Sequence, residues 1–414
     1  MIPLALNTLV ASTIEDAALR RRQALQPVGG KGDKIFPPTY PGEGRNAPPR
    51  HVYEKRRLET QDTWCVLVDS VQSQANRLEE CLLQAMADGI PIPHVAVDFS
   101  DARLEGISSI TSLDAPHRVY DAILRDSLLG KEPFMESEVG RRLAKAKAED
   151  ASALLEISPT ALLFGAWHST GEGGGIGAKF ARCLISEITG IDVPVEEVTD
   201  RRTGEIDFRT TGRRTGSRMD PLGILRKVEV FKGEYGWSTS DAAAGKKAKK
   251  VRPSEINHGN IAPSVQPLGV TCDHLEHSFV LSFAALRRLR FGGGEERDSA
   301  ARAFLAALGL LALAEQDARG YALRSRCDLV CDGRAALELV HPDGTTDAVS
   351  IDRAGAHKLY MDAFEAARAA GFQLSGTPLA LTPQDKLVEI VRKSQDLALH
   401  GAGGEDGDSD DPSS

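Results

Sequence analysis

The chain has 414 residues, a formal net charge of −9, 41% hydrophobic residues and only 5% aromatic residues. This length and hydrophobicity allow a sizeable core, which excludes a disordered or fibrous protein. There is no run of eighteen apolar residues, and Glu15 and Asp16 precede the first basic cluster, which argues against a membrane span and a secretory signal. We therefore expect a cytoplasmic protein with no membrane partner.

The cysteines predict neither a disulfide framework nor a metal site. Five of the six lie among apolar neighbours, which is typical of reduced thiols in a core. Cys327 and Cys331 are close in sequence but lack a second pair of ligands, and their setting resembles a strand. We expect no metal ion and no cofactor.

The first part of the chain alternates strands with helices. A Gly/Pro-rich stretch that begins at Gln26 is not expected to hold regular structure. Apolar periodicity predicts, in order, a short helix within 1–50, a strand at 63–70, a helix at 72–89, a strand at 94–100 and an inserted helical subdomain over 115–156.

A glycine-rich segment follows, with five glycines within residues 171–177. The apolar run TALLFGAW at 160–167 predicts a buried strand before it, and AKFARCLISEITG at 178–190 predicts a helix after it. A glycine-rich loop that opens a helix directs unpaired N–H groups at its guest. An anion is the expected guest.

The last part predicts a mixed α+β fold. We expect a strand from His277, a long helix at 295–320, strands at 322–333 and 335–344, and amphipathic helices at 351–371 and 382–401. Strands and helices interleave without regular βα repetition, which favours an α+β sheet with long insertions.

Charge is unevenly distributed along the chain. Residues 401–414 hold five acidic residues and no basic one, a composition typical of a disordered tail. Residues 200–252 hold fourteen Lys and Arg against seven Asp and Glu. A solvated loop explains such a run, and so does a basic arm for a polyanion.

Three anionic guests can be compared at the glycine loop. Ala178 and Phe180 occupy the positions where a triphosphate loop needs Lys and a hydroxyl, so that interpretation fails. Gly173, Gly175 and Ala178 fit a dinucleotide fingerprint, with Asp192 or Glu196 as its acidic residue. Nucleic acid is supported by the hydrogen-bond donors on both sides of the glycine loop, and by two polar loops at 215–224 and 252–270.

Several blocks also resemble a known family. VDSVQSQANRLEE, SPTALLFGAWHSTGEGGGIGAKFARCLISEITG, TGSRMDPLGI, SEINHGNIAPS and LSFAALRRLRF occur in this order, within about residues 15–340. They are similar to blocks of the crRNA-binding backbone subunit of type I-G (formerly I-U) CRISPR Cascade complexes, a member of the RAMP superfamily. Residues 225–251 and those after 400 have no clear counterpart.

The resemblance implies a fold and partners. The expected fold is α+β, an RRM-like (ferredoxin-like) palm with inserted helical finger-like and basic thumb-like segments. The implied partners are crRNA, target DNA, other copies of the chain and other Cascade subunits. The resulting boundaries are 1–62 for an extended segment joining the palm, 63–114 and 157–200 for the palm, 115–156 for the helical insertion, 201–256 for the basic insertion, 257–400 for the remaining palm and C-terminal helices, and 401–414 for the tail.

The resemblance implies RNA binding and no catalytic residue. The candidate RNA-binding residues are Asn76, Arg77, His168, Ser169, Thr170, Gly173, Gly174, Gly175, Gly177, Lys179, Arg182, Arg213, Arg214, Arg218, Asn257, His258 and Asn260. Trp167, Trp237 and Tyr235 are further candidates for stacking on bases.

Two alternatives remain open. A metal-dependent nuclease of the same superfamily would need carboxylates such as Asp69, Asp98, Asp220 and Asp328 to cluster. A dinucleotide-dependent oxidoreductase would need the Gly173 fingerprint to lie between a strand and a helix.

Overall fold

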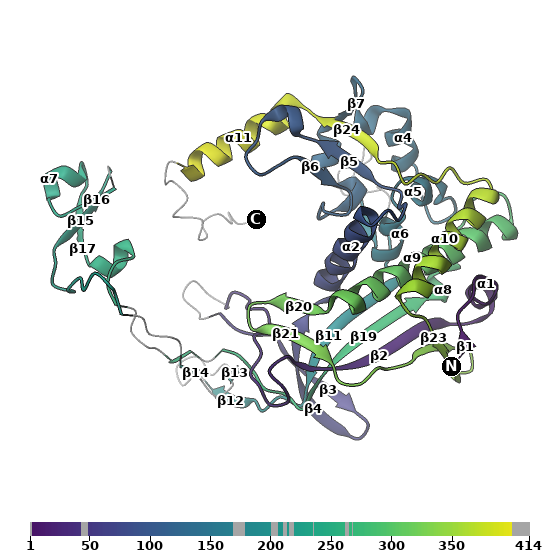
Figure 1. Cartoon of the computed structure of the whole chain (residues 1–414), viewed down its shortest axis with the longest axis horizontal. Helices are drawn as coiled ribbons and strands as arrows, with labels where there is room; N and C mark the ends of the chain where they lie inside the picture. The colour runs from purple at the N-terminus through teal and green to yellow at the C-terminus, as the bar shows by residue number, and fades with distance from the viewer. Residues whose placement is uncertain are drawn as a thin grey trace. The chain divides into compact units, whose positions relative to one another are not determined.

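The structure is a computed structural model, which describes residues 2–42, 49–168, 179–199, 206–209, 213–214, 219–234, 236–260, 265–266 and 268–399 (Figure 1). The chain forms two compact units. Unit 1 comprises Met1–Lys31, Leu67–Gly190 and His274–Ser414, and unit 2 comprises Gly32–Val66 and Ile191–Asp273. Strands β4 (Gln61–Asp69) and β11 (Leu184–Ile191) cross the boundaries between these segments.

A curled, largely antiparallel sheet is the main feature of unit 1. Its strands run in the order β1-β23-β22-β2-β19-β11-β4, and β21 pairs with both β2 and β20. Besides β4 and β11, they are β1 (Ile2–Pro3), β2 (Ala18–Pro27), β19 (His274–Ser282), β20 (Tyr321–Arg324), β21 (Cys327–Cys331), β22 (Leu337–Val340) and β23 (Thr346–Ser350). Every second residue of β19 is buried, because one face of the sheet is covered and the other is not.

Helices cover the buried face of this sheet. They are α1 (Leu6–Glu15), α2 (Val71–Ala87), α8 (Phe283–Leu286), α9 (Glu295–Arg319) and α10 (Arg353–Ala369). Figure 1 shows α9 crossing β2, β19 and β11, with α2 and α10 beside it. Gly309 permits this approach, since a Cβ there would lie 2.9 Å from a Leu184 methyl carbon on β11. Most of α9 is therefore core.

The remaining elements of unit 1 surround a second, five-stranded sheet, ordered β6-β5-β24-β7-β8. Its strands are β5 (Val95–Asp98), β6 (Ser109–Thr111), β7 (Ser127–Leu129), β8 (Glu132–Pro133) and β24 (Leu379–Pro383). The helices and short strands beside it are η1 (Ser100–Ala102), η2 (Arg118–Tyr120), α3 (Ala122–Arg125), η3 (Phe134–Glu136), α4 (Glu138–Ala144), α5 (Ser152–Ile157), α6 (Thr160–Phe164), β9 (Ala166–Trp167), β10 (Lys179–Phe180) and α11 (Asp385–Leu399). The segment 115–156 is therefore only partly helical, because β7 and β8 form a hairpin within it.

In the residues of unit 2 that the structure describes, the elements are short strands and two short helices. They are β3 (Tyr53–Leu58), β12 (Glu196–Thr199), β13 (Ile206–Arg209), β14 (Arg213–Arg214), β15 (Val230–Gly233), β16 (Gly236–Ser238), α7 (Asp241–Ala244), β17 (Lys249–Val251), η4 (Pro253–Ile256) and β18 (Val265–Gln266). Strand β3 pairs with the part of β4 that belongs to this unit.

The structure confirms most of the predicted long elements and corrects the region around the glycine loop. The predicted helices at 72–89, 295–320, 351–371 and 382–401 are α2, α9, α10 and α11. The strand expected at 160–167 is wrong, because Thr160–Phe164 is helix α6. The helix expected at 178–190 is also wrong: β10 and β11 occupy it, and Leu184, Ser186 and Ile188 alternate into the core.

A buried histidine lies where this sheet meets the helices. The His277 ring on β19 makes hydrogen bonds with Ser186 Oγ at 2.7 Å and with Tyr321 Oη at 3.1 Å. Burial, reinforced by the charge of Arg21, lowers its pKa to about 3. The ring is therefore neutral in the folded protein at any pH near neutrality.

This histidine predicts a loss of stability in mild acid. Below about pH 6.5 the unfolded chain binds a proton at His277 that the folded protein does not, so the free energy of unfolding falls by up to about 1.4 kcal/mol per pH unit. The contribution of His277 is independent of pH above that range. In urea titrations at several pH values, the His277→Gln variant should show a shallower acid slope. An unchanged slope would contradict the assignment.

Candidate nucleic-acid interface

The glycine loop begins and ends in a short hairpin of unit 1. Strands β9 and β10 pair antiparallel, with Trp167 opposite Lys179 and Ala166 opposite Phe180. The predicted loop residues lie outside the described part of the chain: Ser169, Thr170, Gly173, Gly174, Gly175 and Gly177. No helix begins after the loop, so the helix N-terminus that favoured an anion is absent at 179–191. The dinucleotide interpretation fails for the same reason.

An exposed tryptophan and a lysine mark the base of this loop. Residues opposite each other in a strand pair project to the same face. The Lys179 Nζ lies 5.7 Å from the centre of the Trp167 ring, and Trp167 is 57% exposed. An exposed indole offers a stacking face for a base, and the ammonium beside it offers a charge for a phosphate.

Buried contacts hold the base of the loop in place. Glu79 on α2 accepts two hydrogen bonds of 2.7 Å from Arg118, which also donates to the Gly165 carbonyl at 3.0 Å. Gly165 has a φ of +84°, and a Cβ there would lie 3.0 Å from Arg182 Cγ. Arg182 Nε donates to the Phe164 carbonyl at 3.0 Å. Arg182, a predicted RNA contact, thus also supports the turn into β9.

His168 has a packing partner in the structure. Its ring stacks on Tyr120, with ring centres 4.9 Å apart and an interplanar angle of 13°. Its side chain is buried, and burial together with the charge of Arg125 lowers the pKa of the imidazole. His168 therefore supports the end of β9 as a neutral ring.

The two candidates on α2 differ in their surroundings. Asn76 is exposed, whereas Arg77 forms an ion pair with Asp69, with Arg77 Nε 2.9 Å from Asp69 Oδ2. Arg77 Nη2 also donates to the Leu323 carbonyl at 2.7 Å. Arg77 thus joins α2 to β20, and these contacts occupy donors that a phosphate would need.

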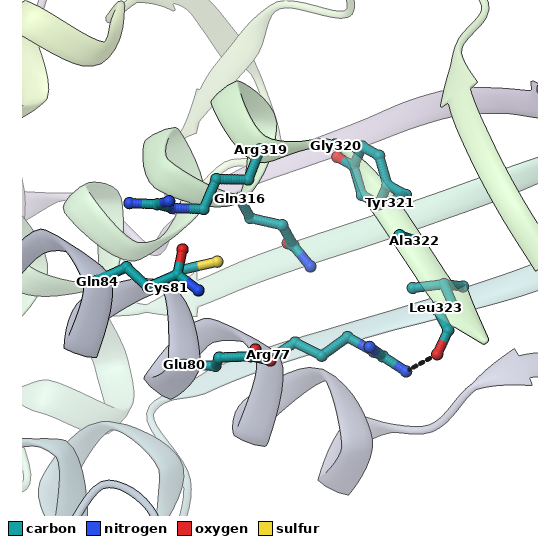
Figure 2. Close-up of a pocket in the computed structure, with 10 residues that line it drawn as sticks. All are labelled: Arg77, Glu80, Cys81, Gln84, Gln316, Arg319, Gly320, Tyr321, Ala322 and Leu323. Atoms are coloured by element: carbon teal, nitrogen blue, oxygen red, sulfur yellow. Dashed lines mark hydrogen bonds between the residues drawn. The ribbon is translucent and has the colours of Figure 1, made fainter.

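A pocket of about 370 Å³ adjoins Arg77 (Figure 2). Figure 2 shows Arg77 reaching from α2 to the Leu323 carbonyl, with Gln316 and Arg319 opposite on α9. Gln316 Nε2 donates to Gln74 Oε1 at 3.1 Å, and Arg319 pairs with Glu315 at 3.2 Å. Burial raises the pKa of the Cys81 thiol in its wall to about 11. Much of the polar lining is therefore already engaged within the protein.

The other predicted residues belong to unit 2. Arg213 and Arg214 form strand β14, which pairs with β18, but their side chains and all of Arg218 lie outside the described residues. Asn257 ends η4 in the left-handed conformation, with a φ of +61°. Asn260 Oδ1 accepts a hydrogen bond of 2.6 Å from the Asp220 N–H.

The structure brings His258 to an exposed tryptophan. The rings of His258 and Trp237 make an edge contact, with centres 5.5 Å apart and an interplanar angle of 71°. Strand register also places Lys232 opposite Trp237 and Lys249 opposite Lys232. Both lysines lie in the basic run at 200–252, but only the pairing of β15 with its neighbours aligns them with Trp237.

The carboxylates considered for a nuclease have separate surroundings. Asp69 is fully buried and accepts hydrogen bonds from four side chains: Ser73, Gln74, Arg77 and Arg324. Asp220 accepts from the backbone N–H groups of Leu222 and Ile224, each at 3.0 Å. Within the described residues, no three His, Cys, Asp or Glu side chains are placed to hold a metal ion. Nor is any described helix long and apolar enough to cross a membrane.

Comparison with known proteins finds a family that is similar to part of the chain. The sequence profile of the family described as CRISPR-associated protein GSU0053 matches residues 19–195. This region extends from β2 to the residue before β12 and includes Trp167, the glycine loop and Lys179. No curated protein matches the chain. Residues 19–195, somewhat less than half of the chain, are thus similar to the CRISPR-associated GSU0053 family, and this match supports a role in CRISPR defence.

Proposed function

We propose that this chain is the crRNA-binding backbone subunit of a type I-G CRISPR Cascade complex, and that it binds RNA without cutting it. The observation that carries the proposal is the pair formed by Trp167 and Lys179 at the base of the glycine loop. This pair is exposed, rigidly supported, and inside the region that matches a CRISPR-associated family. Its chemistry suits a single-stranded polyanion better than a small metabolite.

Stacking is compatible with the use of a guide RNA. An indole covers the face of a base and leaves its hydrogen-bonding edge free for a complementary strand. In guide-RNA complexes base pairing reads the sequence, and the protein holds the backbone. Several copies of the chain, side by side on crRNA with other Cascade subunits, would present the guide to target DNA in this way.

The order of strands in unit 1 supports an RRM-like palm. A ferredoxin-like unit follows the pattern β-α-β-β-α-β. Strands β2, β11, β19 and β21, with α2 after the first and α9 after the third, follow that pattern along the chain. In the sheet their order is β21-β2-β19-β11, so that the first and third strands lie in the middle. We assign the insertions at 115–156 and 201–256 to finger-like and thumb-like roles.

The test is a binding titration with RNA. Protein freed of nucleic acid should bind labelled single-stranded RNA at low salt, and the affinity should fall steeply as salt rises, because phosphate contacts release counterions. The RNA should remain intact with magnesium or manganese. Lack of affinity at low salt would refute the RNA-binding proposal, and cleavage that needs a carboxylate such as Asp220 would favour the nuclease.

A further inference from the structure

A three-stranded antiparallel sheet of unit 2 lies outside the region that matches the family. It consists of β15 between β16 and β17, within residues 230–251. Across it Trp237, Lys232 and Lys249 are paired directly, one from each strand. Because directly paired residues share a face, these three side chains form a row, which we name the Trp237 row.

The opposite face of this sheet is covered. Helix α7 packs on β15 and β16, and a Cβ at Gly233 would lie 2.5 Å from the Ala244 carbonyl oxygen. Gly233 is one residue from Lys232, so it faces the other way. The helix therefore lies on the face away from the Trp237 row. All three members of the row are exposed, Trp237 by 52%.

The charges on the two faces have different partners. Lys250, on the helix side, forms an ion pair with Glu229. Lys232 and Lys249 form no ion pair with any residue that the structure describes. Their ammonium groups are thus available to an anion beside Trp237.

The indole has one fixed neighbour. The edge contact with His258 leaves at least one face of the Trp237 ring uncovered by that histidine, while it limits rotation of the ring. The backbone N–H of His258 donates to the Pro253 carbonyl at 2.9 Å, which anchors the backbone of this residue. A ring whose rotation is limited and that has an open face is suited to stacking.

We propose that the Trp237 row binds single-stranded nucleic acid, with a base stacked on Trp237 and the adjoining phosphates over Lys232 and Lys249. Adjacent strands are about 4.8 Å apart, so the row is a path of two positive charges that leads away from the stacked base. Charge complementarity favours a polyanion, and the indole favours one with unpaired bases. The choice of ligand rests on the proposed function, to which the row adds a second contact independent of Trp167.

The experiment compares variants of the full chain on single-stranded RNA, on single-stranded DNA and on a duplex of the same length. Trp237→Ala should weaken binding of single strands about tenfold, and Trp237→Phe should retain most of the affinity, because a phenyl ring also stacks. Duplex binding should hardly change. A loss confined to RNA or to DNA supports the proposal and identifies the strand that is bound.

The lysines provide a matched control. Lys232→Gln and Lys249→Gln should each lower the slope of log affinity against log salt by about 0.7, as expected for one phosphate contact on a single strand. Lys250 lies on β17 next to Lys249 but on the opposite face, so Lys250→Gln should leave the slope unchanged. Circular dichroism and thermal melting establish that each variant is folded.

Other outcomes would overturn the proposal. Wild-type chain that binds single strands, with folded Trp237→Ala binding equally well, would refute the Trp237 row and leave the proposed function intact. Equal losses on duplex and single strand would refute stacking, and equal effects of Lys249→Gln and Lys250→Gln would refute the assigned face. Wild-type chain that binds neither RNA nor DNA would refute the proposed function as well.

Discussion

Replacement of Asp69 by alanine is expected to lower the free energy of unfolding by about 3 kcal/mol. Asp69 is fully buried at the end of β4 and pairs with Arg77 and Arg324, each at 2.9 Å. It also accepts hydrogen bonds from Ser73 Oγ at 2.8 Å and Gln74 Nε2 at 2.7 Å. Alanine would leave four donors without their acceptor. Water partly reaches both guanidinium groups. The expected loss of stability therefore lies at the lower end of the range for removing one partner of a buried ion pair.

Urea denaturation measures this loss. Asp328→Ala is the matched control, because Asp328 is an exposed carboxylate on β21 and its removal should change stability by less than about 0.5 kcal/mol. If Asp69→Ala were as stable as this control, the buried network would not stabilise unit 1. The structure instead predicts that Arg77→Ala, which removes another member of this network, also lowers stability.

Replacement of Trp167 by alanine is expected to weaken the binding of single-stranded RNA about tenfold. The ring is 57% exposed, so stability should change by less than about 1 kcal/mol. Trp167→Phe should retain most of the affinity, because a smaller ring still stacks. Fluorescence anisotropy with labelled RNA measures the change.

Another exposed apolar residue of unit 1 controls for nonspecific effects. Ile185 on β11 is 46% exposed, and Ile185→Ala should bind RNA like the wild type. Equal affinity of folded Trp167→Ala and wild type would remove the observation on which the proposed function rests. A loss shared by Ile185→Ala would indicate general damage to the surface.

Long periodic elements could be predicted from the sequence, and buried polar residues explain why β11 and β2 were not. The region 178–190 has apolar residues at Phe180, Leu184 and Ile188, a spacing that suits a helix. In the structure Ser186 lies on the same buried face, between Leu184 and Ile188. Its hydroxyl group forms hydrogen bonds with His277 and Gln74. A polar residue in the core hid the alternation of a strand.

Strand β2 was missed for the same reason. Its buried residues are Leu19, Arg21, Gln23, Leu25 and Pro27, and the arginine and glutamine give the segment the pattern of a polar surface. Arg21 is buried because it pairs with Asp317 on α9, almost three hundred residues later in the chain. The segment contains no signal that would reveal this partner.

The candidate site could be predicted by residue type but not by arrangement. Lys179 and Trp237 were recognised as a cation and a stacking ring, whereas the alignment of Lys232 and Lys249 with Trp237 depends on strand register. Arg77 was expected to contact RNA, yet the structure engages it with Asp69, to which no local pattern pointed. Charge and aromaticity are visible in a sequence, but the partner that occupies a side chain is not.

Native mass spectrometry of the chain with single-stranded RNAs of increasing length tests the central claim most directly. If the chain coats guide RNA, the number of bound copies should rise in steps with RNA length, each step adding one copy over a few nucleotides, and the RNA should keep its full mass. A single copy at every length, or RNA fragments in the presence of magnesium, would contradict the account.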